Sequence, residues 1–257
     1  MKNIYIGDIH GRKSWKNIVE DHPDVDNIIF IGDYFDSFNV EPVVQLHNAK
    51  EIVEFKKWRE LDPTKKVYLL TGNHDHHYWP GVKFTGNTSG FQATMWYQFN
   101  EFFIQEEKMF QMAVLIGKNL CTHAGVSSTF IEDEGYWEKN KNENNIADFL
   151  NDLFHHKPNH FGFDSYFDKG YGYADGYGND IWQTPIWIRP KALQHSNKKT
   201  TLLKNYIQII GHTPQPSLDI KGKANNTGGK YYYIDCLSKK EYLIEIDNVF
   251  SVGVINN

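Results

Sequence analysis

The chain has 257 residues, enough to bury a full hydrophobic core in one large domain. Its formal net charge of −5 argues against a general attraction to a nucleic-acid backbone. Two cysteines are too few for a disulfide framework, and no apolar run approaches the roughly 18 residues that span a bilayer. Asp8 and His10 interrupt the stretch where a signal peptide would need continuous apolar residues. We therefore expect a cytoplasmic protein with no membrane partner and no strong affinity for nucleic acids.

The first seventy residues alternate between strand and helix patterns. Short apolar runs at Asn3–Ile6, Asn27–Ile31 and Lys66–Leu70 predict three strands, and a glycine follows closely after each. A helix is expected to start within Lys13–Asp21, and apolar residues spaced i, i+3 and i+7 predict an amphipathic helix over Glu41–Glu60. The resulting β-α-β-α-β order is typical of a sheet covered by helices.

The rest of the chain adds a helix, a hairpin, a polar loop-and-helix segment and three strands. In chain order they are expected at Phe91–Ile104, Gln111–Ile116 with Asn119–Thr122, Lys139–Asn151, Tyr206–Ile210, Lys230–Asp235 and Glu241–Asp247. The last two strands flank a turn at 238–240. His160–Asp180 is rich in glycine and aromatic residues without a clear period, which indicates an ordered loop or cap rather than a linker. We expect a single domain over residues 1–257, with an aromatic, glycine-rich insertion or cap at about 155–188.

Side chains that can bind metal follow glycine-marked strand ends at five places. Glycine lets the backbone turn sharply and approach a ligand closely. Loops at the carboxyl edge of an α/β sheet cluster in space, so residues far apart in sequence can converge there. The candidate metal ligands are Asp8, His10, Asp33, Asn73, His123 and His212.

This donor set contains two carboxylates, one amide oxygen and three imidazoles, but no thiolate. A structural zinc site usually draws on cysteine, so the mixture favours a catalytic site. Six ligands are too many for one catalytic ion with open positions, but they fit two ions roughly 3.5–4 Å apart that share one carboxylate. We expect two divalent metal ions, Mn²⁺ in the first place, with Fe, Zn²⁺ and Mg²⁺ as alternatives.

Five motifs, in this order and over nearly the whole chain, resemble those of the calcineurin-like metallophosphoesterases. The motifs are GDIHG at Gly7–Gly11, GDYFD at Gly32–Asp36, GNHD at Gly72–Asp75, HAG at His123–Gly125 and GHT at Gly211–Thr213. The resemblance implies a four-layer α/β/β/α sandwich of two mixed sheets flanked by helices. The strand patterns alone support only an α/β fold with loops at a sheet edge.

Within that family the chain looks nearest to the bacterial and phage phosphatases of the phosphoprotein-phosphatase and diadenosine-tetraphosphatase branch. Trp187–Pro190 stands ahead of Ile210–Pro214, as in that branch. The closing strand at Tyr233–Asp235 agrees with the same assignment.

The resemblance implies a role for each matched residue. The ligands of the first ion would be Asp8, His10 and Asp33. Asp33 would also bridge to the second ion, whose other ligands would be Asn73, His123 and His212. A metal-bridging hydroxide would attack phosphorus.

The same resemblance makes His74 the general acid that protonates the leaving oxygen. Asp36 would hydrogen-bond to His74 and keep it oriented. The neighbouring His76 and His77 extend the third motif, and we expect them in solvent or behind the site rather than on a metal ion.

Positive charge around the phosphate is where the sequence departs from the family pattern. Protein phosphatases of the branch carry an arginine after the second-motif aspartate and another before GNH, whereas this chain has Ser37 and Thr71. Their absence argues against a phosphoserine protein substrate. Arg189 is the best remaining phosphate-binding candidate because its planar two-pronged donor matches phosphate. An ion pair of purely structural value is an equal interpretation of Arg189. Arg12, directly after the first motif, is a second candidate, although a surface position at a helix start is favoured for it.

The leading hypothesis is a dinuclear metal-dependent phosphoesterase that acts on a small or exposed phosphorylated substrate, as a monoesterase or a diesterase. A nucleotide or dinucleoside polyphosphate hydrolase is the first alternative, and a Ser/Thr phosphoprotein phosphatase is the second. A catalytically inactive metal-binding scaffold is the alternative from another class. It is disfavoured because a scaffold needs neither the six ligands nor His74 and Asp36.

Overall fold

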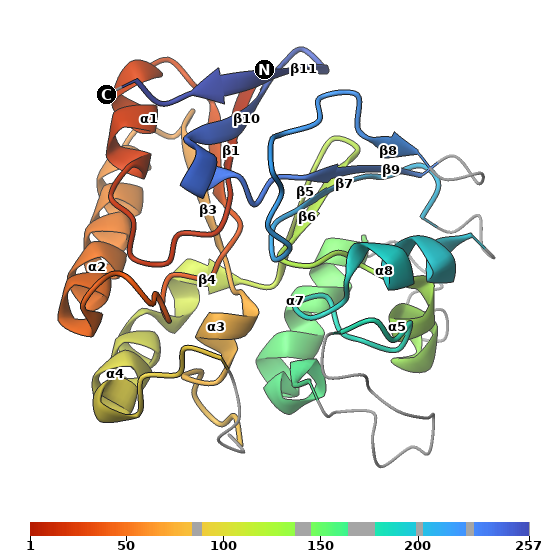
Figure 1. The fold of residues 1–257 in the computed structure, drawn as a ribbon, viewed down its shortest axis with the longest axis horizontal. Helices are drawn as coiled ribbons and strands as arrows, with labels where there is room; N and C mark the ends of the chain where they lie inside the picture. The colour runs from red at the N-terminus through yellow and green to blue at the C-terminus, as the bar shows by residue number, and fades with distance from the viewer. Residues whose placement is uncertain (84–88, 137–144, 164–177, 199–202, 225–228, 257) are drawn as a thin grey trace.

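The computed structural model describes residues 1–83, 89–136, 145–163, 178–198, 203–224 and 229–256. Within these residues the chain forms two mixed β-sheets with helices on their outer sides (Figure 1). The predicted four-layer α/β/β/α sandwich is thereby confirmed. The predicted Lys139–Asn151 segment and the aromatic segment both fall partly outside the described residues.

The first sheet has six strands in the order β11-β10-β1-β2-β3-β4. Their bounds are Lys2–Ile6 (β1), Asn27–Phe30 (β2), Lys66–Leu70 (β3), Phe110–Gln111 (β4), Glu241–Ile246 (β10) and Val249–Val254 (β11). β1 to β4 run parallel, whereas β10 and β11 are antiparallel to their neighbours. The loops after β1, β2 and β3 therefore leave the same edge of the sheet.

The second sheet has five strands in the order β5-β6-β7-β9-β8. Their bounds are Ala113–Ile116 (β5), Asn119–Thr122 (β6), Ile207–Ile210 (β7), Lys223–Ala224 (β8) and Lys230–Tyr233 (β9). β6, β7 and β9 are parallel, and β5 and β8 pair antiparallel at the two edges. The loops after β6 and β7 therefore also leave one common edge.

Helices cover the outer sides of both sheets. The α-helices are Trp15–Asp21 (α1), Pro42–Arg59 (α2), Asn73–His76 (α3), Trp96–Glu106 (α4), Ser128–Asp133 (α5), Ile146–His156 (α7) and Pro190–Asn197 (α8). Short 3-10 turns are Ala93–Met95 (η1), Glu107–Met109 (η2), Pro158–Phe161 (η3) and Leu237–Lys239 (η5). In Figure 1, α1 and α2 lie beside the first sheet, and α5, α7 and α8 gather on the side of the second. No helix of the described residues is long and apolar enough to cross a membrane.

The alternation of side chains along each strand builds the layers. In β1, Ile4 and Ile6 belong to the core beneath the helices, together with Ile52 of α2. Tyr5, on the opposite face of the same strand, packs instead in a core between the sheets with Ile209 of β7. Successive strand residues point to opposite faces, so a strand buried on both faces needs a continuous apolar run.

A buried polar cluster also joins the two sheets. Glu245 Oε2 of β10 accepts hydrogen bonds from Asn3 Nδ2 at 2.7 Å and from Tyr5 Oη at 2.6 Å, both in β1. Asn119 Nδ2 of β6, in the other sheet, donates to the same oxygen at 2.8 Å. These side chains are 4% exposed or less, so each donor depends on that one carboxylate oxygen or on its neighbours in the cluster.

The strand and helix predictions are confirmed for the first seventy residues, but the helix expected over Phe91–Ile104 begins later, at Trp96. Gln92 donates its backbone N–H to Tyr78 Oη at 2.8 Å rather than entering the helix. The packing of this loop against Tyr78 therefore overrides the local preference for helix.

Two sheet assignments also differ from the sequence pattern. Gln111, expected to open the hairpin, pairs with β3 in the first sheet, and the hairpin starts at Ala113 in the second. The strands expected around the turn at 238–240 do not pair, because β9 joins β7 and β10 joins β1. On its other side β10 pairs with β11, through a turn in which Asp247 and Asn248 have φ of 49° and 68°.

Candidate metal centre

The predicted ligands converge at the adjacent loop edges of the two sheets. One ligand atom each from Asp8, His10 and Asp33 lies within 4.8 Å of the others, and the same holds for Asp33, His123 and His212. Asp33 belongs to both groups. This is the arrangement that two ions sharing one carboxylate require.

Asn73 joins the second of these groups. Its Oδ1 lies 3.0 Å from His123 Nε2 and 2.8 Å from His212 Nδ1. Asn73 is the first residue of α3, directly after β3, so the end of this strand places its amide beside the two histidines. All six predicted ligands are therefore in one cluster.

In each of the three histidines, one ring nitrogen faces the cluster and the other contacts a backbone carbonyl. A carbonyl only accepts, so this nitrogen carries the proton and the other keeps a lone pair directed into the cluster. The contacts are His10 Nδ1 to Phe35 O at 2.7 Å, His123 Nδ1 to Ile31 O at 2.9 Å and His212 Nε2 to Trp187 O at 2.9 Å. The rings are thereby oriented with their other nitrogen toward the cluster, as a metal ligand requires.

The backbone at the cluster is strained. His10, Asp33, Asp36 and His212 have φ of 42°, 54°, 62° and 63°, a region that side chains other than glycine rarely adopt. Such residues persist only where surrounding contacts hold them, and they concentrate at functional sites. These four residues lie in the loops after β1, β2 and β7, where the left-handed backbone sets the direction of their side chains.

Two glycines make room for the carboxylates. A Cβ at Gly72 would lie 2.1 Å from Asp33 Oδ1, and a Cβ at Gly211 would lie 2.2 Å from Asp8 Oδ1. The close approach of backbone to ligand that the sequence predicted at these glycines is present. Any larger residue would displace a carboxylate.

Buried carboxylates crowd the first group. Burial and the neighbouring Asp235 and Asp33 raise the pKa of Asp8 well above its usual value. Burial and Asp33 likewise raise the pKa of Asp235 to about 6. For Asp33, burial acts in the same direction, but His123 and the other histidines outweigh it and hold its pKa well below the usual range. Divalent cations offset such crowding and match this oxygen and imidazole donor set, so the residues fit two metal ions.

His74 lies at the rim of this cluster. Its Nδ1 is 3.0 Å from Asp36 Oδ2, and its ring meets His10 edge-on at 5.2 Å between centroids. Burial alone would lower the pKa of His74, but Asp33 and Asp36 outweigh burial and raise it to about 9. The contact predicted between His74 and Asp36 is present.

Asp75, the last residue of the third motif, has a role that the sequence reading missed. Its carboxylate accepts backbone N–H groups from Asp33 at 2.7 Å, Tyr34 at 2.8 Å and Gly72 at 2.9 Å. It therefore ties the loop after β2 to the loop after β3. The position of Asp75 within the GNHD motif was the sequence feature that could have indicated this role.

We expect Asp75→Asn to destabilise the fold by about 1–3 kcal/mol, because an amide offers one acceptor oxygen where three buried N–H groups need partners. Urea unfolding measures the change, with Asp152→Asn on the exposed face of α7 as the control, since its side chain is 75% exposed. Equal stability of the two variants would show that the Asp75 bonds contribute nothing.

Both candidate phosphate-binding arginines support the loops of the cluster. Arg12 Nη1 donates to Asp8 O at 3.1 Å, and Arg189 Nη1 donates to His212 O at 3.1 Å and to Thr213 Oγ1 at 3.0 Å. Each guanidinium thus holds the backbone of a predicted ligand. Their charges also lie near Asp8.

Three further residues lie around the cluster, and one of them carries no signal in the sequence. Asp235 follows β9 without a glycine-aspartate motif, so no local signal marked it. His76 and His77 are each only 4% exposed, so of the two placements expected for them, in solvent or behind the site, the structure has the second. His76 Nε2 contacts Pro158 O at 2.7 Å, and His77 Nε2 lies 2.8 Å from Asp36 Oδ2.

The predicted cap at 155–188 is described only outside residues 164–177. One described part contacts α3, through Pro158 O and His76, and the other reaches the cluster, through Trp187 O and His212. Thr184 Oγ1 donates to Phe161 O at 2.9 Å and joins these two parts. The boundaries of this segment as an insertion remain a prediction.

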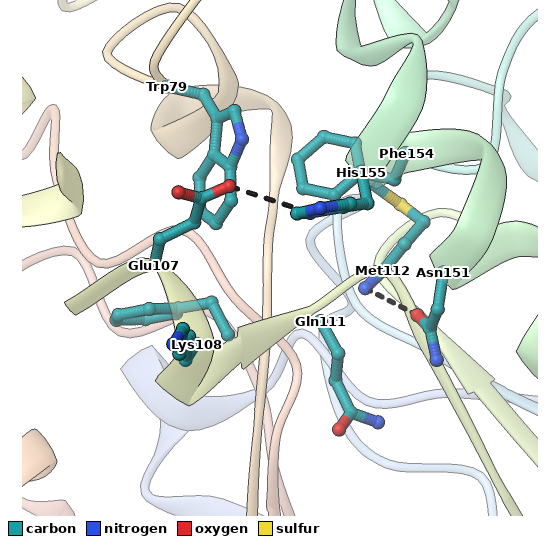
Figure 2. Close-up of a pocket in the computed structure, with 9 residues that line it drawn as sticks. Trp79, Glu107, Lys108, Gln111, Met112, Asn151, Phe154 and His155 are labelled. Carbon is teal, nitrogen blue, oxygen red and sulfur yellow. Dashed lines mark hydrogen bonds and ion pairs between the residues drawn. The ribbon is translucent and has the colours of Figure 1, made fainter.

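A cavity of about 250 Å³ lies away from the cluster, between β4 and α7. Figure 2 shows Trp79 and Phe154 on its wall and the Glu107 carboxylate directed toward His155, at 3.6 Å. Gln111 of β4 also lines it. None of the described residues around this cavity is a predicted ligand, so it is separate from the metal centre.

The chain belongs to the calcineurin-like phosphoesterase family, whose model matches residues 1–216. A search of curated proteins found no match. Among solved structures, a metallophosphoesterase from Sphaerobacter thermophilus is 12% identical with a TM-score of 0.40, covering 100% of this chain and 89% of that one. A Thermotoga maritima protein is 12% identical with a TM-score of 0.37 and covers 98% of each chain. A dimetal phosphatase from Danio rerio is 9% identical with a TM-score of 0.32, covering 100% of this chain and 99% of that one.

The family and the two groups of metal-capable residues together support a metal-dependent phosphoesterase that binds divalent metal. The resemblance drawn from the five sequence motifs is confirmed at the level of the family.

Proposed function

We propose that the protein hydrolyses phosphate esters at two divalent ions, Mn²⁺ in the first place, with His74 as general acid. The observation that carries the proposal is the position of His74. It is held by Asp36 on one side, and on the other it stands against His10, at the edge of two metal-capable groups that share Asp33.

The candidate ligands would be divided between the two ions. Asp8, His10 and Asp33 would hold the first ion. Asp33, Asn73, His123 and His212 would hold the second. When bound, the ions supply a water nucleophile at neutral pH and neutralise charge on the phosphate oxygens.

His74 would provide the proton for the leaving group. Because Nδ1 faces Asp36, the proton for the leaving oxygen would come from Nε2. Asp36 keeps the ring in the required orientation and stabilises its charged form.

Positive charge for the phosphate would come from Arg12 and Arg189, which stand beside Asp8 while their guanidinium groups hold the loop backbone. The two arginines of related protein phosphatases are replaced by Ser37 and Thr71, and Thr71 is fully buried. The site therefore lacks two of the arginine side chains that bind phosphate in those protein phosphatases. We propose a small or exposed phosphorylated molecule as substrate.

The test is hydrolysis of p-nitrophenyl phosphate and of bis-p-nitrophenyl phosphate, with added Mn²⁺ and with EDTA. The wild type should turn over only with metal. His74→Asn should keep about two equivalents of metal, because it removes no ligand, and should lose roughly 10²-fold or more in kcat. His156→Asn, on the exposed face of α7, is the matched histidine control.

Bound metal without turnover of either ester would contradict the proposal and favour an inactive scaffold. If the wild type is active, the ratio of the two rates shows whether monoesters or diesters are preferred.

A further inference from the structure

The Asp36 carboxylate is held from three directions, of which His74 is only one. His77 Nε2 lies 2.8 Å from Oδ2, the oxygen that also contacts His74 Nδ1 at 3.0 Å. Tyr78 Oη donates to Oδ1 at 2.6 Å. Asp36 itself is 1% exposed, so these groups replace water around its charge.

His77 and Tyr78 are fixed by their own surroundings. The His77 ring, 4% exposed, meets Tyr78 edge-on at 4.3 Å and Phe91 at 5.2 Å between centroids. The Tyr78 ring stacks on Phe91 at 5.5 Å, and its hydroxyl accepts the backbone N–H of Gln92 at 2.8 Å. Neither side chain can leave Asp36 without breaking this packing.

These contacts determine where Asp36 can point. The backbone of Asp36 is in the left-handed region, with φ of 62°. This conformation is unfavourable for a residue with a side chain, so contacts with the surrounding structure must maintain it. One histidine could hold one oxygen of a carboxylate while the other remained free to rotate. Donors on both oxygens fix the plane of the group, and with it the direction of the His74 ring.

We infer that His77 and Tyr78 are positioning residues for the general acid: they hold Asp36 in the orientation that directs His74 Nε2 toward the leaving oxygen. The inference rests on the proposed function of His74. Neither residue touches substrate or metal in this assignment, and both act through Asp36.

A positioning role has a kinetic signature that a packing role lacks. An alkoxide or phenolate of high basicity needs a proton as it leaves, whereas dinitrophenolate leaves without one. A misdirected acid therefore slows the hydrolysis of phenyl phosphate and spares that of 2,4-dinitrophenyl phosphate. General loosening of the site slows both.

The variants are Tyr78→Phe, which removes only the hydroxyl, and His77→Phe, with His77→Gln as the conservative replacement that keeps a donor. His76→Gln and His76→Phe are the matched controls, because His76 is the adjacent residue with equal burial and contacts Pro158 O instead of Asp36. Metal content and the thermal midpoint are measured for every variant.

We expect Tyr78→Phe and His77→Phe to lower kcat for phenyl phosphate roughly 10-fold, in the range of lost outer hydrogen-bond partners, with KM and the dinitrophenyl rate nearly unchanged. His77→Gln should recover part of the loss. Equal loss on both esters, or a loss matched by the His76 controls, would overturn the inference.

A readout independent of turnover separates this inference from the proposed function. In the protein loaded with diamagnetic Zn²⁺, the His74 Nδ1 proton that faces Asp36 should give a downfield NMR signal, which Tyr78→Phe and His77→Phe shift or broaden and the His76 controls leave in place. An unchanged signal would refute the positioning network. If the two variants change the signal but the wild type hydrolyses no ester, the proposed function is refuted and the network is retained.

Discussion

Gly72→Ala is expected to abolish both metal binding and hydrolysis. The added Cβ would lie 2.1 Å from Asp33 Oδ1 and 2.6 Å from the Asp33 backbone nitrogen, distances that real Cβ atoms essentially never show. The carboxylate must move, and Asp33 is the residue shared by both metal-capable groups. A misplacement of about 1 Å at a reacting centre can cost roughly 10²-fold in rate, and here both ions would be affected.

Metal analysis of the purified protein and p-nitrophenyl phosphate hydrolysis measure this result. The matched control is Gly162→Ala, where φ is −64° and the nearest atom to the new Cβ is Asn159 O at 3.4 Å. Gly162→Ala should keep metal and activity. Full metal content in Gly72→Ala would mean that Asp33 does not need the position observed here.

Glu245→Ala is expected to cause the largest loss of stability. Removing the carboxylate leaves Asn3, Tyr5 and Asn119 without their shared acceptor between the sheets. A buried donor without a partner costs about 1–3 kcal/mol, so the loss should be on the order of 3 kcal/mol or more. Glu245→Gln, with similar volume but one acceptor oxygen, should fall between Glu245→Ala and the wild type.

Urea unfolding provides the free energies. Glu54→Ala is the control, because Glu54 pairs with Lys57 at 3.0 Å while its side chain is 71% exposed, and such pairs contribute little. Glu245→Ala should unfold at a much lower urea concentration than this control. A difference below about 0.5 kcal/mol would place Glu245 among ordinary surface substitutions and contradict the buried network.

The sequence predicted the site better than it predicted the sheets. The candidate ligands could be chosen because each is marked locally, by a glycine within two residues of a metal-capable side chain at the end of an apolar run. Asp33 and His212 illustrate this, since their motifs need no knowledge of distant residues. Asp235 carries no such mark, and its proximity to Asp8 arises only when β9 and β1 are placed in facing sheets.

Sheet membership could not be derived from the pattern because an apolar run buried on both faces looks the same in either sheet. Gln111 and Ala113 are two residues apart, yet they pair in different sheets. β9 and β10 likewise separate at η5. The sequence left open whether His77 lies in solvent or behind the site, since its burial depends on packing against Phe91 of a later loop.

The division of the proposed ligands between the two sheets would make metal binding part of folding. Asp8, His10, Asp33 and Asn73 follow strands of the first sheet, whereas His123 and His212 follow strands of the second. The second proposed ion, whose candidate ligands come from both sheets, would act as a removable cross-link between them and would bind fully only when they are docked. At a free ion concentration 100 times the dissociation constant, such linkage adds about 2.7 kcal/mol to the free energy of unfolding. The supply of metal in the cell would then govern how long the protein survives as well as whether it can act.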